Sequence, residues 1–132
     1  MAEQFERVKN YILELGHSID QEIAAEEIVI INDEEQGIRN LVIDCEEDVL
    51  VVEQPIIEID DSASTEVYKR LLQMNRSLVY GAFVLHDEGK LLLYRNTLAL
   101  ENLDLNELES TINALSLGLA ENGEELLSYA AK

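Results

Sequence analysis

Cysteine and proline are nearly absent from this chain of 132 residues. Its single cysteine, Cys45, cannot form a disulfide within the chain, so nothing in the sequence requires an oxidising compartment. No run of eighteen apolar residues occurs, and the N-terminal stretch MAEQFERVKN carries acids where a signal peptide would carry a basic segment followed by an apolar one. We therefore expect a soluble, cytoplasmic protein that does not enter a membrane.

Basic residues are also scarce. Nine Lys and Arg stand against 28 Asp and Glu, which gives a formal net charge of −19. Binding to phosphates depends on basic side chains that release counterions, so nucleic acids and anionic membranes are excluded as expected partners. The imbalance is concentrated in residues 1–66, which carry 19 acids and three bases. A partner drawn by charge should meet this half, although acidity can also serve solubility alone.

The composition otherwise favours one folded domain. Hydrophobic residues make up 47% of the chain and charged residues 28%, which is typical of globular proteins rather than disordered ones. A chain of this length can bury about two-thirds of its unfolded surface, which is enough for an ordinary core. We expect a single domain over residues 1–132.

Apolar spacing predicts the elements of the first half. Phe5, Val8, Ile12 and Leu15 recur at helical spacing, and Gly16 can end that helix. Short β-branched runs separated by acidic or Gly-containing stretches then predict three antiparallel strands at 28–31, 38–43 and 49–52, and residues 19–24 could add a short strand before them. Pro55 cannot donate to a sheet, so it must lie at an edge or a bulge.

The second half returns to helices around a hairpin. The segment DSASTEVYKRLLQMN has helical spacing, and Ser62 or Ser64 can cap it. The stretches SLVYGAFVLH and KLLLYRNTL flank the turn residues Asp87-Glu88-Gly89 and predict a β-hairpin. Asp104 with Glu107 resembles a capping box that opens a last helix, which Asn122-Gly123 should end or kink.

This order, α-β-β-β-α-β-β-α, predicts an α+β fold with helices packed on one face of a mainly antiparallel sheet. Strands that are wet on one face should alternate apolar and polar residues, but Val49-Leu50-Val51-Val52 and Leu91-Leu92-Leu93 do not. The second face therefore requires a cover. A copy of the chain, a client or a long helix that curls round the sheet could each supply it.

Four stretches resemble the YbjN-like proteins, small bacterial proteins described as Tir-chaperone-like that share the type III secretion chaperone fold. They are FERVKNYILELG, GIRNLVIDCEEDVLVVEQ, YKRLLQMNRSLVYGAFVLHDEGKLLLYR and NTLALENLDLNELESTINALS, and they cover nearly the whole chain. The resemblance implies a homodimer that binds an extended or partly helical client segment over hydrophobic surface. It also implies a dimer interface on the middle helix, which Val67, Leu71 and Met74 would supply.

Residues suited to catalysis or metal binding are sparse. Cys45 is followed by Glu46, Glu47 and Asp48, whose charges should raise its pKa and keep it protonated, and the two histidines, His17 and His86, are far apart in the sequence. The acidic runs fall in expected loops and lack the spacing of a calcium site. No nucleotide-binding glycine motif is present. We predict no catalytic residues, no metal site and no cofactor.

These observations favour a non-catalytic, acidic protein-binding module that acts as a homodimer on a client or regulatory protein. Tyr80, Phe83 and Tyr94 are the aromatic candidates for the client-binding site, because aromatic residues tend to anchor interfaces. The alternatives are that all three pack in the core, that the chain is a small enzyme with an unrecognised carboxylate or metal site, or that it is an acidic regulator of a basic partner.

Overall fold

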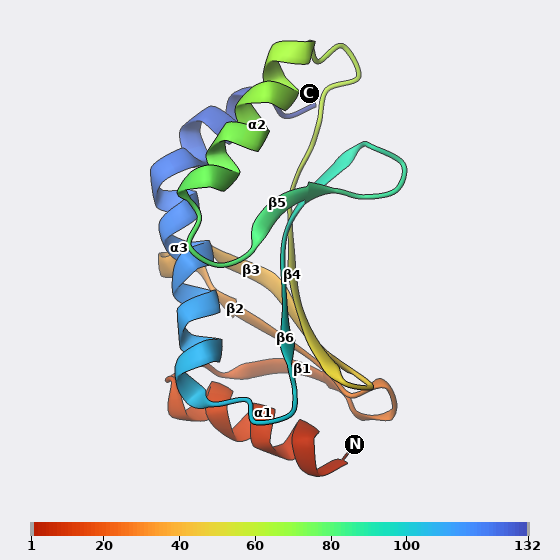
Figure 1. Cartoon of the computed structure of the whole chain (residues 1–132), viewed down its shortest axis with the longest axis vertical. Coiled ribbons are helices and arrows are strands. Elements are labelled where there is room, and N and C mark those ends of the chain that lie inside the picture. Colours follow the sequence, from red (N-terminus) through yellow and green to blue (C-terminus); the bar gives the residue numbers. More distant parts are fainter. Residues whose placement is uncertain (1, 132) are drawn as a thin grey trace.

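The computed structural model describes residues 2–131 as three helices and six strands, drawn in Figure 1. The order is α1 (Ala2–Glu14), β1 (Ile19–Ile23), β2 (Ile28–Asp33), β3 (Ile38–Glu46), β4 (Val49–Glu58), α2 (Thr65–Ser77), β5 (Ala82–Leu85), β6 (Leu91–Ala99) and α3 (Leu105–Ser128). The short 3-10 turns Ala24–Glu26 and Glu34–Gln36 join the first three strands. Four strands precede α2, because the short strand that residues 19–24 could add is present as β1.

The strands make one antiparallel sheet in the order β1-β2-β3-β4-β6-β5. The prediction that Pro55 lies at an edge or a bulge is confirmed by a bulge, because the pairing of β4 with β6 shifts register between Pro55 and Ile57. Gln54, just before the bulge, is buried. Its side chain bonds to the backbone at the start of β3, where β3 and β4 are not paired as strands. The Gln54 amide accepts from the Arg39 N–H at 2.9 Å and donates to the Gly37 carbonyl at 3.0 Å.

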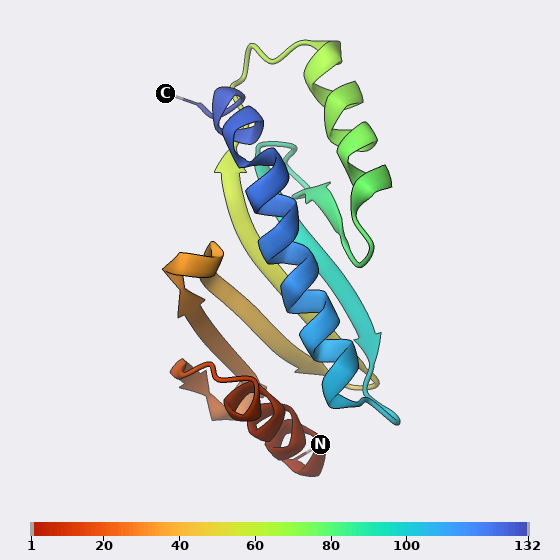
Figure 2. The same cartoon turned by 90° about the vertical axis from the view of Figure 1, so that its left-hand side faces the viewer.

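All three helices lie on the same side of the sheet, as predicted (Figure 1). One continuous core fills the space between them: α1 contributes Phe5, Val8 and Ile12, and α2 contributes Leu71 and Met74. The turned view shows α3 running diagonally along the sheet, with α1 near one end and α2 near the other (Figure 2). The opposite side of the sheet carries no helix among residues 2–131.

Helix α3 begins as predicted and ends later than predicted. Asp104 accepts from the Glu107 N–H at 2.8 Å, while the Glu107 side chain accepts from the Asp104 N–H at 3.4 Å, which completes the capping box. The prediction that Asn122-Gly123 ends or kinks the helix is wrong, since the helix continues to Ser128. Leu126 is buried in the core beyond them, so tertiary packing outweighs the low helix propensity of Gly123.

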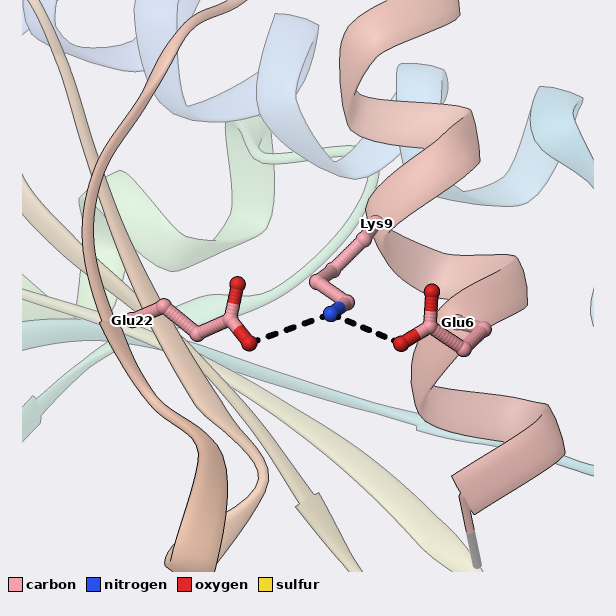
Figure 3. Close-up of polar contacts among 3 residues, drawn as sticks. All are labelled: Glu6, Lys9 and Glu22. Carbon is pink, nitrogen blue, oxygen red and sulfur yellow. Dashed lines mark hydrogen bonds and ion pairs between the residues drawn. The ribbon is translucent and has the colours of Figure 1, made fainter.

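Lys9 ties α1 to the edge strand β1 (Figure 3). Its ammonium group lies 2.8 Å from Glu6 on the same helix and 3.1 Å from Glu22 on β1. These two hydrogen bonds raise the pKa of Lys9 above its usual value. The same ammonium group lies 4.5 Å from the centre of the Phe5 ring. Lys9 thus links α1 to β1 in addition to the core contacts of the helix.

Candidate polypeptide-binding surface

The side of the sheet away from the helices carries a set of apolar side chains, which we call the open face. Strand register defines it, because residues paired across antiparallel strands project to the same side. Ile30 pairs with Val42, Val51 pairs with Asp44, and Leu93 pairs with Val84. The open face includes Ile28 and Ile30 of β2, Val42 and Asp44 of β3, Val51 and Glu53 of β4, Val84 of β5, and Leu93 and Arg95 of β6.

These apolar residues do not belong to the core. Val51 and Leu93 are only 6% and 8% exposed, yet neither is part of the core cluster under the helices. Ile28, Ile30 and Val42 are half-buried, and they too pack outside that cluster. They shield one another across the strands instead of meeting a second layer. The open face is therefore a partly dehydrated apolar surface with no cover among residues 2–131.

The charged residues of the open face are mainly acids. Glu53 forms an ion pair with Arg95, its cross-strand neighbour. Asp44 lies between Ile28 and Val51 in the next row and has no Lys or Arg within ion-pair distance in the described part of the chain. Burial raises the pKa of Asp44 to about 6, and a hydrogen bond to Glu46 adds to the shift. The nearby charges of Glu46, Glu26 and Glu53 act in the same direction.

A second apolar surface lies on the helix side. The connection from α2 to β5 and the middle of α3 enclose a shallow hollow of about 250 Å³, lined mainly by apolar groups. Val79 on its rim is 78% exposed, and Leu117 and Tyr80 are exposed beside it. Leu72, on the solvent side of α2, is 72% exposed.

The residues predicted for the dimer interface lie mostly inside the chain. Leu71 and Met74 are 5% and 1% exposed and pack in the core, while Val67 is half-buried against it. The side chains of Leu71 and Met74 are used in the core of the chain itself, whereas Val67 keeps part of its surface exposed. The exposed apolar residues of α2 are Tyr68 and Leu72. Helical spacing revealed the apolar line but not which of two adjacent lines faces the sheet.

The three aromatic candidates are also separated. Phe83 and Tyr94 pair across β5 and β6 and are buried in the core, whereas Tyr80 is exposed. The Tyr94 hydroxyl donates to the carbonyl oxygens of Tyr80 and Thr111, at 2.9 and 3.1 Å. Phe83 and Tyr94 therefore hold the sheet to α3 and offer no surface to a client. Sequence reasoning missed Ile28, Ile30 and Val42, although the unbroken apolar runs at 28–31 and 41–43 give the same signal of a second apolar face as the run at 49–52.

The reactive side chains do not converge. Cys45 is buried in β3, and burial, with the charges of Glu27 and Asp44, raises the pKa of its thiol to about 11. The expected direction is confirmed, but burial rather than the following acids is its main cause. His17 lies 3.9 Å from Asp33 beyond α1, whereas His86 is exposed after β5. Among residues 2–131, no three or more His, Cys, Asp or Glu side chains are grouped to hold a metal ion.

Comparisons with known proteins agree with this architecture. The family model CesT_Tir_1 matches residues 1–132. The chain belongs to this Tir-chaperone-like family. No curated protein sequence matches it. Among solved structures, the fold is similar to that of YbjN, a candidate transcription regulator from E. coli, with a TM-score of 0.68 and 15% identity over 92% of each chain.

The expected YbjN-like, secretion-chaperone-like fold is thus confirmed. Within residues 2–131, no helix combines the length and the apolar character that a membrane span requires.

Proposed function

We propose that this chain is a non-catalytic protein-binding module that holds a client polypeptide on its open face. The observation that carries the proposal is the set of apolar side chains on β2, β3, β4 and β6 that pack outside the core and have no covering layer in the described part of the chain. Uncovered apolar patches beyond a few hundred Å² are uncommon on monomers and mark interaction sites. Membership of a chaperone-like family supports the same role.

The test is binding of a fluorescent amphipathic peptide of about 18 residues, or five helical turns, with a Leu stripe and equal numbers of Lys and Glu elsewhere. Ile30→Thr removes apolar surface from the open face, and a buried hydroxyl without a partner costs about 1–3 kcal/mol. We expect affinity to fall by about fivefold or more. Leu13→Thr is the control, because exposed Leu13 lies on the solvent side of α1.

Affinity that changes equally in both variants, with both folded by circular dichroism, would remove the open face from the binding site. Salt separates this proposal from that of an acidic regulator. At about 1 M NaCl the Debye length is near 3 Å, so binding by charge alone is lost while binding by apolar contact persists. Turnover of a substrate by the purified protein would exclude the non-catalytic role.

The proposal includes a homodimer that contacts through α2. Leu72 is the most exposed large apolar residue on that helix, and Tyr68 lies one turn before it. Light scattering should give twice the 14.9 kDa chain mass, and Leu72→Asp should return it to the monomer value, since an unpaired buried charge is strongly unfavourable. Gln73→Asp adds the same group at the neighbouring exposed position and should leave the dimer intact. A monomer mass for the unaltered chain would exclude the dimer.

A further inference from the structure

The open face combines apolar residues with acids in a regular pattern. One cross-strand row runs Ile28–Asp44–Val51, and the next runs Ile30–Val42–Glu53–Arg95. Each row therefore places one carboxylate among β-branched side chains. Glu53 is paired with Arg95, whereas Asp44 has no ion-pair partner among residues 2–131, and the charges of Glu46, Glu26 and Glu53 all oppose its ionisation. The open face thus presents a negative group without a counter-charge beside apolar side chains, near the end of β3.

A half-buried carboxylate among other acids is unfavourable in the free protein. Burial and like charges raise the pKa of Asp44 to about 6, so the group is mostly ionised near pH 7 at a cost to folding. A cation placed over Asp44 would relieve this repulsion, and the relief would be larger once a partner excludes water. The chain supplies no such cation from residues 2–131, so it would have to come from a partner.

The same charges disfavour a second copy as the occupant. If the open faces of two copies packed together, the acids of one would face the acids of the other. The basic residue of the open face, Arg95, is already paired with Glu53, and each chain has a net charge of −19. A single strand laid flat on the sheet would also leave its backbone groups unpaired. The usual cover for a sheet face is a helix with an apolar stripe, as on the other side of this sheet.

We propose that the open face binds a basic amphipathic helix of a partner protein, whose apolar stripe covers Ile28, Ile30, Val42 and Val51 and whose Lys or Arg side chain lies over Asp44. This inference rests on the proposed function and specifies the chemical class of the client. It predicts selection by charge among peptides that share one apolar stripe.

The experiment compares three peptides of about 18 residues with the same Leu stripe. Their other positions carry Lys only, Glu only, or both in equal number. Affinity is measured by fluorescence anisotropy for the unaltered chain, Asp44→Asn and Asp61→Asn. Asp61 is an exposed acid in the connection from β4 to α2, so its variant removes the same charge outside the open face. The Asn side chain keeps the size of Asp44 and can donate a hydrogen bond to Glu46, as the protonated form of Asp44 does.

We expect the Lys peptide to bind most tightly. Asp44→Asn should weaken that binding by about fivefold, as expected for one ion pair of roughly 1 kcal/mol, and leave the affinity for the neutral peptide unchanged. Asp61→Asn should leave the affinities for the Lys peptide and for the neutral peptide unchanged.

If Asp44→Asn and Asp61→Asn weaken binding of the Lys peptide equally, the peptide is attracted only by the overall charge of the chain, and this inference is overturned. Neutral and Lys peptides that bind equally would also overturn it while the proposed function stands. Failure of all three peptides to bind would overturn both. A change in the oligomeric mass of Asp44→Asn would identify a second copy as the occupant and overturn the inference as well.

Discussion

Tyr94 is the residue at which the sheet and α3 are locked together. It is fully buried, and its hydroxyl group reaches the carbonyl oxygens of Tyr80 and Thr111. Gly81 packs against the same ring and has a φ of +78°. A residue with a side chain at this position would strain the backbone and would also collide with the buried Tyr94 ring. A Cβ atom at Gly81 would lie 2.6 Å from the Tyr94 hydroxyl oxygen.

Gly81→Ala should therefore destabilise the chain by about 3 kcal/mol or more, from left-handed backbone strain and overpacking together. Gly89→Ala is the matched control, because Gly89 has a φ of +75° but nothing within 4 Å of the added Cβ. It should cost only the backbone strain, about 1–2 kcal/mol. Chemical denaturation of both variants measures the difference. Equal losses would show that the contact with Tyr94 is unimportant.

Asp44 gives the fold a predictable pH dependence. Its pKa is about 6 in the folded chain and near 3.8 when unperturbed. Between these values the folded chain holds a proton that the unfolded chain lacks, so the free energy of unfolding rises as the pH falls from about 7 toward 4. This gain disappears as the pH rises through the folded pKa. Asp44→Asn should raise the melting temperature near pH 7 and flatten its rise on acidification, whereas Asp61→Asn should keep the slope. A melting profile of Asp44→Asn as steep as that of the unaltered chain would contradict the assignment.

At the residue scale, the sequence predicted features that depend on local chemistry. The Asp104–Glu107 capping box needs only two residues three apart, and the acids beside Cys45 gave the direction of its pKa shift, although burial is the main cause. The roles of Phe83 and Tyr94 could not be predicted in the same way. An aromatic residue on a strand suits a core as well as an interface, and only the position of α3 decides between them.

Helix α3 contains two glycines with opposite surroundings, which makes the element testable. A Cβ at Gly123 would meet nothing within 4 Å, so Gly123→Ala should stabilise the chain by about 1 kcal/mol through helix propensity. Gly118 is buried, and a Cβ there would lie 2.7 Å from a methyl group of Leu78. Gly118→Ala should therefore be less stable than Gly123→Ala by about 1 kcal/mol or more. If Gly123→Ala destabilises the chain, α3 does not continue through this position.

Most elements were predictable because their periodicity is strong. The six-strand sheet differs from the expected order only by β1, whose short sequence IDQEI has three polar residues out of five. The end of α3 was missed because Asn-Gly is a turn signal on its own, and the buried Leu126 that overrides it is visible only in the packed chain. The facing side of α2 was also undetermined, since Leu71 and Leu72 are adjacent and equally apolar.

The whole molecule carries a charge that should weaken its fold. With a net charge of −19, mutual repulsion among carboxylates opposes the compact state at neutral pH. About 0.5 M NaCl shortens the range of that repulsion to a few ångströms and should raise the melting temperature. Differential scanning calorimetry at two salt concentrations measures the shift. A lower melting temperature in salt would mean that ion pairs such as Arg70–Glu125, with an N–O distance of 2.8 Å, outweigh the repulsion.

At the scale of the whole molecule, the sequence indicated that the sheet has two apolar faces but left the cover of the second face open. A long helix curling round the sheet was one of the three candidates, and α3 does not do so, because it lies with α1 and α2 over the core. The family match shows the fold and indicates a chaperone-like, protein-binding role. Which partner could cover the second face depends on the residues that lie side by side on it. The sequence does not show this, because only the strand register places Asp44 between Ile28 and Val51.

Methyl NMR of the unaltered chain with the peptide of equal Lys and Glu content tests the open face as the binding site most directly. Neighbours along β2 and β3 provide internal controls, because Ile30 and Val42 point to the open face while Val29 and Ile43 are fully buried under the helices. Binding at the open face predicts that the signals of Ile28, Ile30, Val42 and Val51 shift on titration while those of Val29 and Ile43 stay nearly fixed. Shifts confined to Val79 and Leu117 at the helix-side hollow, with the open-face signals unchanged, would contradict it.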